Sequence, residues 1–279
     1  MTGILYLVST PIGNINDITI RAIEILSSVD MILSEDTRVT SKLLNYHGIT
    51  TLEPLNSFNQ INEDKKAPKI ISQLREGKNI ALVSDAGTPL ISDPGYKIIK
   101  MARESDIKIE PIPGCCALIA GITASGLPSD RFSFFGFLPR SSSKRISYLK
   151  DIADREETLI FYESVHRIQS TIDDMIKVFG GDRLAILCKE ITKMHESFIG
   201  ESLTEIYNFT KNEKSKIKGE FTIIVQGGSN KTDDKGHLDF ILKLLMSDLS
   251  LRRSVEIATL VTDFSKSTIY DHALKIRDQ

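Results

Sequence analysis

Residues 80–95 read IALVSDAGTPLISDPG, and the rest of the chain is best interpreted outward from this stretch. Its first four residues are apolar, and they predict a buried strand bounded by turn-forming residues. The polar segment SDAGTP follows the strand, and a second break, DPG, precedes a helical pattern. Ligands of open α/β sheets bind at the carboxyl ends of the strands. The stretch therefore predicts a ligand-binding loop, with a tight surface turn as the plainer alternative.

Strand and helix patterns alternate on both sides of this loop. Further strands are predicted at residues 4–8, 31–33 and 107–112. Helices are predicted at residues 22–29, 39–46 and 70–76 and again after residue 95, whereas the polar residues 54–69 predict a mobile segment. Such alternation indicates a parallel sheet with helical crossovers. Neither GxGxxG after the first strand nor GxxxxGK[ST] is present, which removes the usual dinucleotide and NTPase interpretations.

The segment PIPG at residues 111–114 marks a predicted domain junction. Beyond it, a helix is predicted at residues 115–125, and strands are predicted at residues 132–137, 158–162, 184–188 and 221–225. Between the first two of these strands lies LPRSSSKR, with the basic residues Arg140, Lys144 and Arg145. This segment is either a solvated loop or a contact for an RNA phosphate backbone.

The last part of the chain predicts a small helical unit. A polar linker is predicted at residues 231–237, and apolar residues at helical spacing follow from Leu238. The final residues have the pattern of a helix-turn-helix, in which Ser265 or Ser267 caps the last helix. About 45 residues are too few for a stable core of their own, so this tail is expected to dock on the body or on a partner.

Composition limits the possible functions. The 279 residues are 41% hydrophobic and 26% charged, with a net charge of −2, so any RNA contact must come from a local basic patch. No apolar run is long enough to span a membrane and no signal pattern begins the chain, so cytoplasm is the expected compartment. The three cysteines lack CxxC spacing and the five histidines are scattered, which predicts no metal.

Several motifs together carry a family resemblance: YLVSTPIGNINDIT, SEDTR, VSDAGTPLISDPGY, PGCCALIAGITASGLPSDRFSFFGFLPR and IFYESVHR. They resemble the bacterial enzymes that methylate a cytidine 2′-oxygen in the decoding region of 16S ribosomal RNA. That group belongs to the tetrapyrrole (corrin/porphyrin) methylase superfamily, which uses S-adenosylmethionine. The resemblance covers almost the whole chain, including the helical tail.

The resemblance implies an α/β fold of two αβα domains with a cofactor cleft between them, followed by the helical tail. The expected boundaries are residues 1–112, 113–230 and 236–279. It also implies a homodimer whose substrate is 16S ribosomal RNA in the small ribosomal subunit, with no DNA or membrane partner. The expected cofactor-binding residues are Pro11, Asp85, Ala86, Gly87, Thr88, Ile91, Cys116, Ala117, Glu163, Glu190, Phe221 and Thr222. Thr88 and the pair Cys115–Cys116 depart from the residues that are common in tetrapyrrole enzymes.

No catalytic pair stands out in the sequence. Transfer of a methyl group from a sulfonium is an in-line displacement, so positioning can supply most of the catalysis. The candidates for substrate-side catalytic roles are Glu35, Asp36 and Arg38, with His166 and Asp85 behind them. Two other functions stay open at this point: a tetrapyrrole or diphthine methylase, and a ribosome-binding factor without catalysis.

Overall fold

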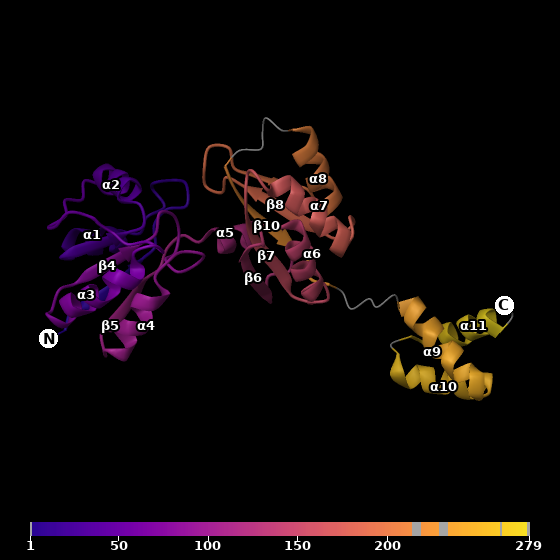
Figure 1. Cartoon of the computed structure of the whole chain (residues 1–279). Coiled ribbons are helices and arrows are strands. Elements are labelled where there is room, and N and C mark those ends of the chain that lie inside the picture. Colours follow the sequence, from indigo (N-terminus) through magenta and orange to yellow (C-terminus); the bar gives the residue numbers. More distant parts are fainter. Residues whose placement is uncertain (1, 214–218, 229–233, 263, 278–279) are drawn as a thin grey trace. The chain divides into compact units, whose positions relative to one another are not determined.

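The computed structural model describes residues 2–213, 219–228, 234–262 and 264–277 (Figure 1). Its contacts divide the chain into two units. The larger unit comprises Met1–Ala153 and Glu157–Gly227, and the smaller comprises Asp154–Glu156 and Gly228–Gln279. None of the described helices has the length and apolar character needed to cross a membrane.

The first half of the larger unit is built on a parallel five-stranded sheet with the strand order β3-β2-β4-β1-β5. Its strands are β1 (Ile4–Val8), β2 (Met31–Ser34), β3 (Asn56–Ser57), β4 (Ile80–Val83) and β5 (Lys108–Ile112). Val83 is in register with Val8 and Ser34, and Val8 with Ile112. The loops that follow β1, β2 and β4 therefore leave the same edge of the sheet.

Four helices cover the two faces of this sheet: α1 (Ile20–Ser28), α2 (Thr37–Tyr46), α3 (Glu63–Arg75) and α4 (Tyr96–Glu104). Leu26 of α1 and Leu44 of α2 pack with Ile32 in one apolar cluster. On the other face, α3 and α4 bury Leu74 and Ile98 against strand residues such as Leu5. This is the parallel sheet with helical crossovers that the alternating pattern predicted, in the αβα layering that the resemblance implied.

The second half contains a mixed five-stranded sheet with the order β6-β7-β10-β8-β9. Its strands are β6 (Phe132–Phe137), β7 (Thr158–Ser164), β8 (Ala185–Lys189), β9 (Ser197–Ile199) and β10 (Glu220–Val225). Only β6 and β7 pair in parallel. The helices α6 (Ser142–Asp151), α7 (Ile168–Phe179) and α8 (Leu203–Asn212) cover one face, and α5 (Ala117–Ala124) covers the other.

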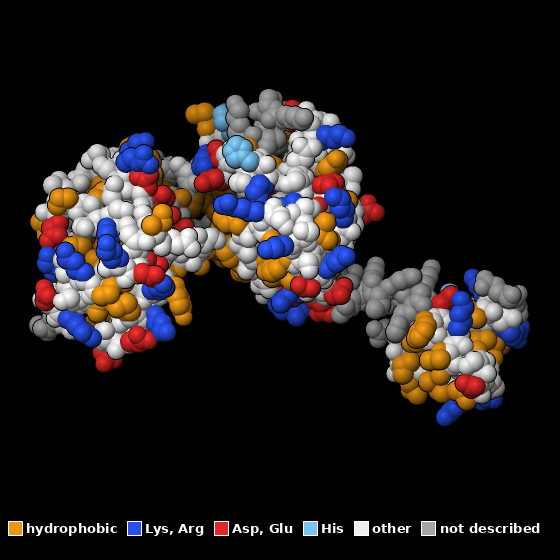
Figure 2. Space-filling model, viewed as in Figure 1, with side chains coloured by type: hydrophobic (Ala, Val, Ile, Leu, Met, Phe, Trp, Pro, Cys, Tyr) orange, Lys and Arg blue, Asp and Glu red, His pale blue; other side chains and the backbone are white. Residues whose placement is uncertain are grey.

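Three helices form the small unit: α9 (Asp234–Asp248), α10 (Leu251–Val261) and α11 (Lys266–Arg277). They enclose an apolar cluster that includes Leu242, Val255 and Ile269. Of the two residues predicted to cap the last helix, Ser265 accepts a hydrogen bond from the Thr268 amide, 3.3 Å away. Figure 2 shows hydrophobic side chains gathered on the visible face of this unit. The exposed large apolar residues of the unit include Phe240, Leu244, Leu260 and Val261.

Several local predictions were wrong. The segment predicted to be mobile, residues 54–69, contains β3 and the first half of α3, which tolerates Pro68 inside its early turns. The predicted loop at residues 138–145 ends inside α6, because Ser141 accepts a hydrogen bond from the Lys144 amide and starts a helix there. Strand β9 and helix α8 were missed. Residues 231–233 of the predicted linker lie outside the described residues, and residues 234–237 already belong to α9.

Candidate functional site

The loop after β4 is fastened to the loop after β1 at the carboxyl edge of the first sheet. Thr10 and Gly87 exchange two backbone hydrogen bonds, of 2.9 and 3.0 Å. The Ser84 hydroxyl donates to the Gly87 carbonyl, and the Thr10 hydroxyl donates to the Ser84 carbonyl. Gly87 has a φ of +85°, which glycine adopts without steric cost. Residues 84–88 are therefore held as a rigid turn with their backbone at the edge of the sheet.

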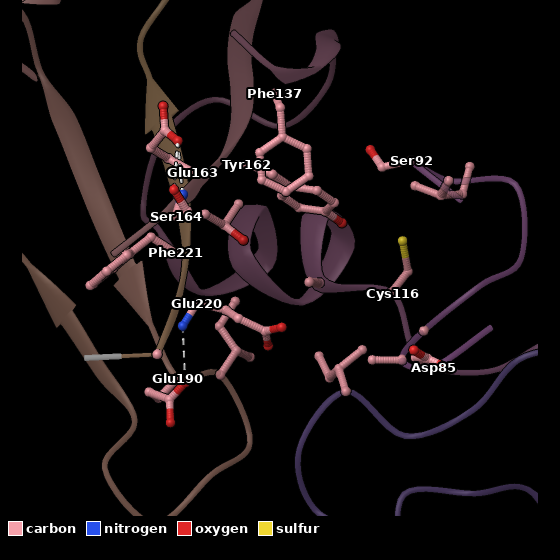
Figure 3. A pocket seen from close by; sticks show the side chains of 18 of the residues that line it. Asp85, Ser92, Cys116, Phe137, Tyr162, Glu163, Ser164, Glu190, Glu220 and Phe221 are labelled. Atoms are coloured by element: carbon pink, nitrogen blue, oxygen red, sulfur yellow. Dashed lines mark hydrogen bonds between the residues drawn. The ribbon is translucent and has the colours of Figure 1, made fainter. Parts of the chain in front are cut away.

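A cavity of about 390 Å³ lies between this turn and the ends of β7, β8 and β10. Its volume is within the range of small-molecule sites. The loop after β4 contributes one side of the lining, together with Ile12 from the loop after β1 (Figure 3). Cys116 and Ala117 lie at the start of α5, and the remaining lining residues come from strands of the second sheet and the loops beside them. The lining contains apolar side chains, such as Ile12, Ile91, Ile191 and Phe221, and also carboxylates, such as Asp85 and Asp93.

The structure brings together nearly all the residues predicted to bind a cofactor. Those that line the cavity are Asp85, Ala86, Gly87, Thr88, Ile91, Cys116, Ala117, Glu163, Glu190, Phe221 and Thr222. Pro11 lines a neighbouring cavity of about 430 Å³, which shares Ile12, Asp85 and Ala86 with the first. Thr88 Oγ1 donates to the Cys115 carbonyl, 3.0 Å away, and so links the turn to the start of α5. That these twelve residues bind a cofactor stays a prediction.

Backbone strain is concentrated beside the cavity. Among the described residues, positive φ angles outside glycine occur at Leu90, Ser92, Asp106, Glu190 and Thr192. Leu90 and Ser92 flank Ile91, and Glu190 and Thr192 flank Ile191, and both isoleucines line the cavity. Strained residues persist where surrounding contacts fix them, and they are common at ligand sites.

Carboxylates of the first half raise one another's pKa values. Burial raises the pKa of Asp93 to about 7, and the negative charges of Glu35 and Asp85 add to this effect. The pKa values of Glu35 and Asp85 are also raised, mainly by burial. Asp93 Oδ2 is buried without a hydrogen-bond partner in the described structure. Since Asp85 and Asp93 both line the cavity, its first-half side is suited to a positively charged ligand.

The three predicted catalytic residues do not line the cavity. Asp36 caps α2 and forms an ion pair with Arg38, with 2.6 Å between Oδ2 and Nη2. Hydrogen bonds from Arg38 lower the pKa of Asp36 to about 2. Glu35 interacts electrostatically with the cavity residues Asp93 and Asp85, and the Asp36 amide donates to Asp85 Oδ1 at 2.8 Å. His166 is exposed and is not part of the lining, whereas Asp85 is.

The carboxylate of Glu163 has structural partners although the residue lines the cavity. Its Oε2 accepts from Thr171 Oγ1 at 2.7 Å and lies 3.2 Å from Arg167 Nη2. Its Oε1 accepts from the Ser164 amide at 2.8 Å. These contacts hold the end of β7 against α7. Any contact with a ligand from this position would come from the main chain or the apolar part of the side chain.

One of the three predicted RNA contacts is corrected. Arg140 and Lys144 are exposed, whereas the side chain of Arg145 is only 2% exposed. Arg145 Nη2 lies 2.6 Å from Asp174 Oδ2, and its Nε donates to the same oxygen. The prediction for Arg145 was wrong because the residue starts the inward face of α6 instead of lying in a loop.

The sequence reasoning missed several residues of the lining, among them Ser92, Asp93, Phe137, Tyr162 and Lys193. Asp93 belongs to the opening stretch, so its DPG break was a usable signal. Phe137 ends β6 and Tyr162 lies two residues before the end of β7, and the apolar pattern of these strands gave no reason to separate either residue from the core. Among the described residues, no group of three or more His, Cys, Asp or Glu side chains is placed to hold a metal ion.

Comparisons with known proteins agree in pointing to one family. The model of the tetrapyrrole (corrin/porphyrin) methylases matches residues 4–207. The chain is 40% identical over 277 residues to the ribosomal RNA small subunit methyltransferase I of Pasteurella multocida, covering 99% of this chain and 98% of that protein. With the protein of the same name from Escherichia coli O157:H7 it shares 43% identity over 274 residues, covering 98% and 95%.

Solved structures share the fold at much lower sequence identity. A cobalt precorrin-4 methyltransferase of cobalamin biosynthesis aligns with a TM-score of 0.60 and 16% identity, covering 80% of this chain and 94% of that one. A diphthine synthase aligns with a TM-score of 0.61 and 14% identity, covering 80% and 90%. These similarities support the two-sheet architecture and say nothing of the substrate.

Proposed function

Because the chain belongs to the tetrapyrrole (corrin/porphyrin) methylase family, we propose that it transfers a methyl group from S-adenosylmethionine to small-subunit ribosomal RNA. The acceptor we propose is the 2′-oxygen of a cytidine in the decoding region. One observation carries this proposal. The cavity is lined by loops of both halves that contain residues with positive φ angles, and the chain is similar to rRNA methyltransferases over nearly its full length.

The residues present fit S-adenosylmethionine. A Cβ at Gly87 would come within 3.3 Å of Ile12 Cγ2 and φ there is +85°, so the turn that lines the cavity depends on a glycine. Main-chain groups of residues 85–88, 116–117, 190–191 and 221–222 can hold polar parts of the cofactor without charged side chains. Ile91, Ile191 and Phe221 supply apolar surface. When bound, the cofactor supplies an electrophilic methyl group on a sulfonium.

Charge supports the same ligand. Asp85 and Asp93 line the cavity beside Glu35, and burial together with their mutual repulsion raises their pKa values. A cation beside them would relieve this repulsion and favour the ionised forms. S-adenosylmethionine carries a sulfonium and an ammonium against one carboxylate, so its net charge suits this side of the cavity.

RNA is the proposed substrate because the similarity to rRNA methyltransferases includes the helical tail, which lies beyond the part matched by the family model. Arg140 and Lys144 are exposed and available to phosphates. A 2′-hydroxyl distinguishes RNA from DNA at a single site. Its proton can pass to a weakly placed base, and Asp93, with a pKa of about 7, is the cavity carboxylate best suited to share a proton near neutral pH.

The test uses labelled S-adenosylmethionine and small ribosomal subunits from cells that lack this protein. We expect one labelled cytidine, with the methyl group on its ribose by mass mapping, and no transfer when its 2′-OH is replaced by hydrogen. Label on the cytosine ring would contradict the 2′-oxygen assignment. Methylation of a porphyrinoid or a diphthine precursor with no transfer to RNA would contradict the proposed substrate.

The tail should affect RNA methylation and leave cofactor binding unchanged. Removing residues 238–279 retains every residue that lines the cavity. We expect unchanged affinity for S-adenosylmethionine by calorimetry and a loss of about tenfold or more in methylation of small subunits, since an RNA-docking unit is absent. Sedimentation of the full chain tests the proposed homodimer in the same preparation. An unfolded truncated protein would show that the tail belongs to the core.

A further inference from the structure

The end of β6 contains a β-bulge that changes the direction of the strand beside the cavity. β6 is an edge strand of the second sheet, and its register with β7 shifts between Phe134 and Phe137. Gly136 lies inside this shift with a φ of +61°. A Cβ at Gly136 would be 3.4 Å from Ser92 Oγ, so the bulge lies close to the loop after β4. Bulges at sheet edges commonly redirect one side chain.

The redirected side chain is Phe137. It lines the cavity, yet 56% of it is exposed, although Phe135 in the same strand packs against the apolar core. Its ring lies 5.9 Å from that of Tyr162, edge to face, and Tyr162 is in turn 4.8 Å from Phe134. Figure 3 shows Phe137 beside Tyr162 and across from Ser92. One ring of this aromatic group therefore remains open to an incoming ligand.

The segment after Phe137 is fixed by two arginines. Arg167 Nη2 donates to the Leu138 carbonyl at 2.7 Å and is paired with Glu163. Arg145 Nη1 donates to the carbonyls of Pro139 and Arg140, at 3.3 and 3.4 Å. Asp174 anchors Arg145 from the other side. The buried Arg145 thus positions the backbone that leads from Phe137 to the exposed Arg140.

Exposed cations lie directly beyond this segment. Arg140 and Lys144 are exposed, and in the part of the chain that the structure describes neither is paired with a carboxylate. They follow Phe137 by three and seven residues. An exposed aromatic ring next to unpaired cations is the combination that single-stranded nucleic acids bind, with bases on the ring and phosphates at the cations.

From this geometry we propose that Phe137 is the stacking surface for a nucleobase of the acceptor strand at the mouth of the cavity, with Arg140 and Lys144 contacting flanking phosphates. The inference rests on the proposed function, because it concerns the RNA that reaches the same cavity. Sequence-specific recognition of RNA mostly uses bases that are unstacked from their neighbours, and an aromatic side chain replaces the lost stacking. The bulge, the carbonyls bound by the two arginines and the exposure of Phe137 are all consistent with one role, which is to hold the Phe137 ring at the edge of the cavity.

The test compares variants of Phe137 in the full-length protein, with unmethylated small subunits as substrate. For Phe137→Ala we expect kcat/KM to fall by about 10- to 100-fold, the range for loss of one base–aromatic stack. Phe137→Tyr should keep most of the activity, whereas Phe137→Leu, which retains apolar bulk, should behave like alanine. Affinity for S-adenosylmethionine should stay within about twofold in all three.

Phe132→Ala is the matched control, because Phe132 is an exposed phenylalanine at the other end of the same strand and does not line the cavity. It should leave kcat/KM unchanged. Full activity of Phe137→Ala beside an active wild type would overturn the inference, as would a parallel loss of cofactor affinity or of dimer in sedimentation. An inactive wild type on every RNA, with cofactor still bound, would instead be a failure of the proposed function.

Discussion

Two loops from different sheets face the cavity with the same backbone pattern and different residues. Residues 90–92 and residues 190–192 each place an isoleucine between two non-glycine residues with positive φ. Ile91 and Ile191 both line the cavity. The first loop is rich in glycine and proline around this pattern, whereas the sequence KEITK at residues 189–193 contains neither. A backbone conformation that lines the cavity can therefore be present without the residues that usually indicate it.

The second loop is held by hydrogen bonds instead. The Thr192 amide donates to Glu196 Oε2 at 2.6 Å, and the Lys193 amide donates to the Glu190 carbonyl. Thr192 Oγ1 also accepts from the Asn14 amide at 3.0 Å, which ties this loop to the loop after β1. Such contacts fix strained φ angles that the residues would not adopt alone.

The loops also differ in how they treat a carboxylate. Asp93, at the end of the first loop, has an unpartnered oxygen and a raised pKa. For Glu190, burial alone would raise the pKa, but hydrogen bonds from Lys193 and from the Glu220 amide outweigh it and lower the pKa. The first loop thus holds a carboxylate, Asp93, with an oxygen that has no hydrogen-bond partner in the described structure. The second loop holds a carboxylate, Glu190, that is paired with Lys193.

The largest effect should come from Gly87→Val, which breaks the glycine-dependent turn. Valine is strained at a φ of +85°, and its Cβ would lie only 3.3 Å from Ile12 Cγ2. We expect affinity for S-adenosylmethionine to fall about 100-fold or more, which is about 2.7 kcal/mol. Calorimetry on the folded variant measures this change.

Gly180→Val is the control for backbone strain alone. Gly180 has the same φ of +85°, and a Cβ there would meet no atom of the described residues within 4 Å. Both variants should lose stability, but only Gly87→Val should lose cofactor affinity. Normal affinity in Gly87→Val would show that the first loop is a structural turn and no more.

Much of the first half could be predicted from the sequence, because parallel strands separated by helices leave alternating apolar patterns that do not depend on distant contacts. The loop after β4 could be predicted for the same reason, through Gly87 and the prolines. The burial of Arg145 could not be predicted, since its ion-pair partner Asp174 is distant in sequence. Strand β9 is three residues long and is defined only by its pairing with β8, and the bulge at Gly136 exists only relative to β7.

A second pair of variants tests the two carboxylates. Asp93→Asn removes an unpaired buried charge and should raise the melting temperature of the ligand-free protein at pH 8 by about 2–4 °C, on the order of 1 kcal/mol after solvent screening. Glu190→Gln removes a paired charge and should lower it. The rise in melting temperature on adding S-adenosylmethionine should shrink in Asp93→Asn, because the cavity then has one carboxylate fewer to favour a cationic ligand.

The pH dependence separates the two effects. The pKa of Asp93 is raised in the folded protein from its ordinary 3.8 to about 7, so its ionisation opposes folding as the pH rises through that window. The advantage of Asp93→Asn should therefore be present at pH 8 and absent near pH 4. The pKa of Glu190 is lowered, so the penalty of Glu190→Gln should persist at pH 8 and vanish as the pH falls through that lowered value. If both variants raised, or both lowered, the melting temperature at pH 8, the proposed difference between the two carboxylates would be contradicted.

The smallest effect should come from Ser92→Gly, which relieves strain in the first loop without removing a described hydrogen bond. Placing a non-glycine residue at a φ of +70° destabilises the folded state by roughly 1–2 kcal/mol, and glycine removes this strain. Glycine also increases the conformational entropy of the unfolded chain, which offsets part of the stabilisation. We expect a net rise in melting temperature of about 1–2 °C for the ligand-free protein. Ser92→Ala keeps the strain and removes the hydroxyl, so it should show no rise. Because a freer loop must be ordered when the cofactor binds, Ser92→Gly should also bind S-adenosylmethionine slightly more weakly. A fall in melting temperature for Ser92→Gly with none for Ser92→Ala would show that this conformation is favoured by its surroundings and stores no strain, and the parallel with residues 190–192 would then be one of geometry alone.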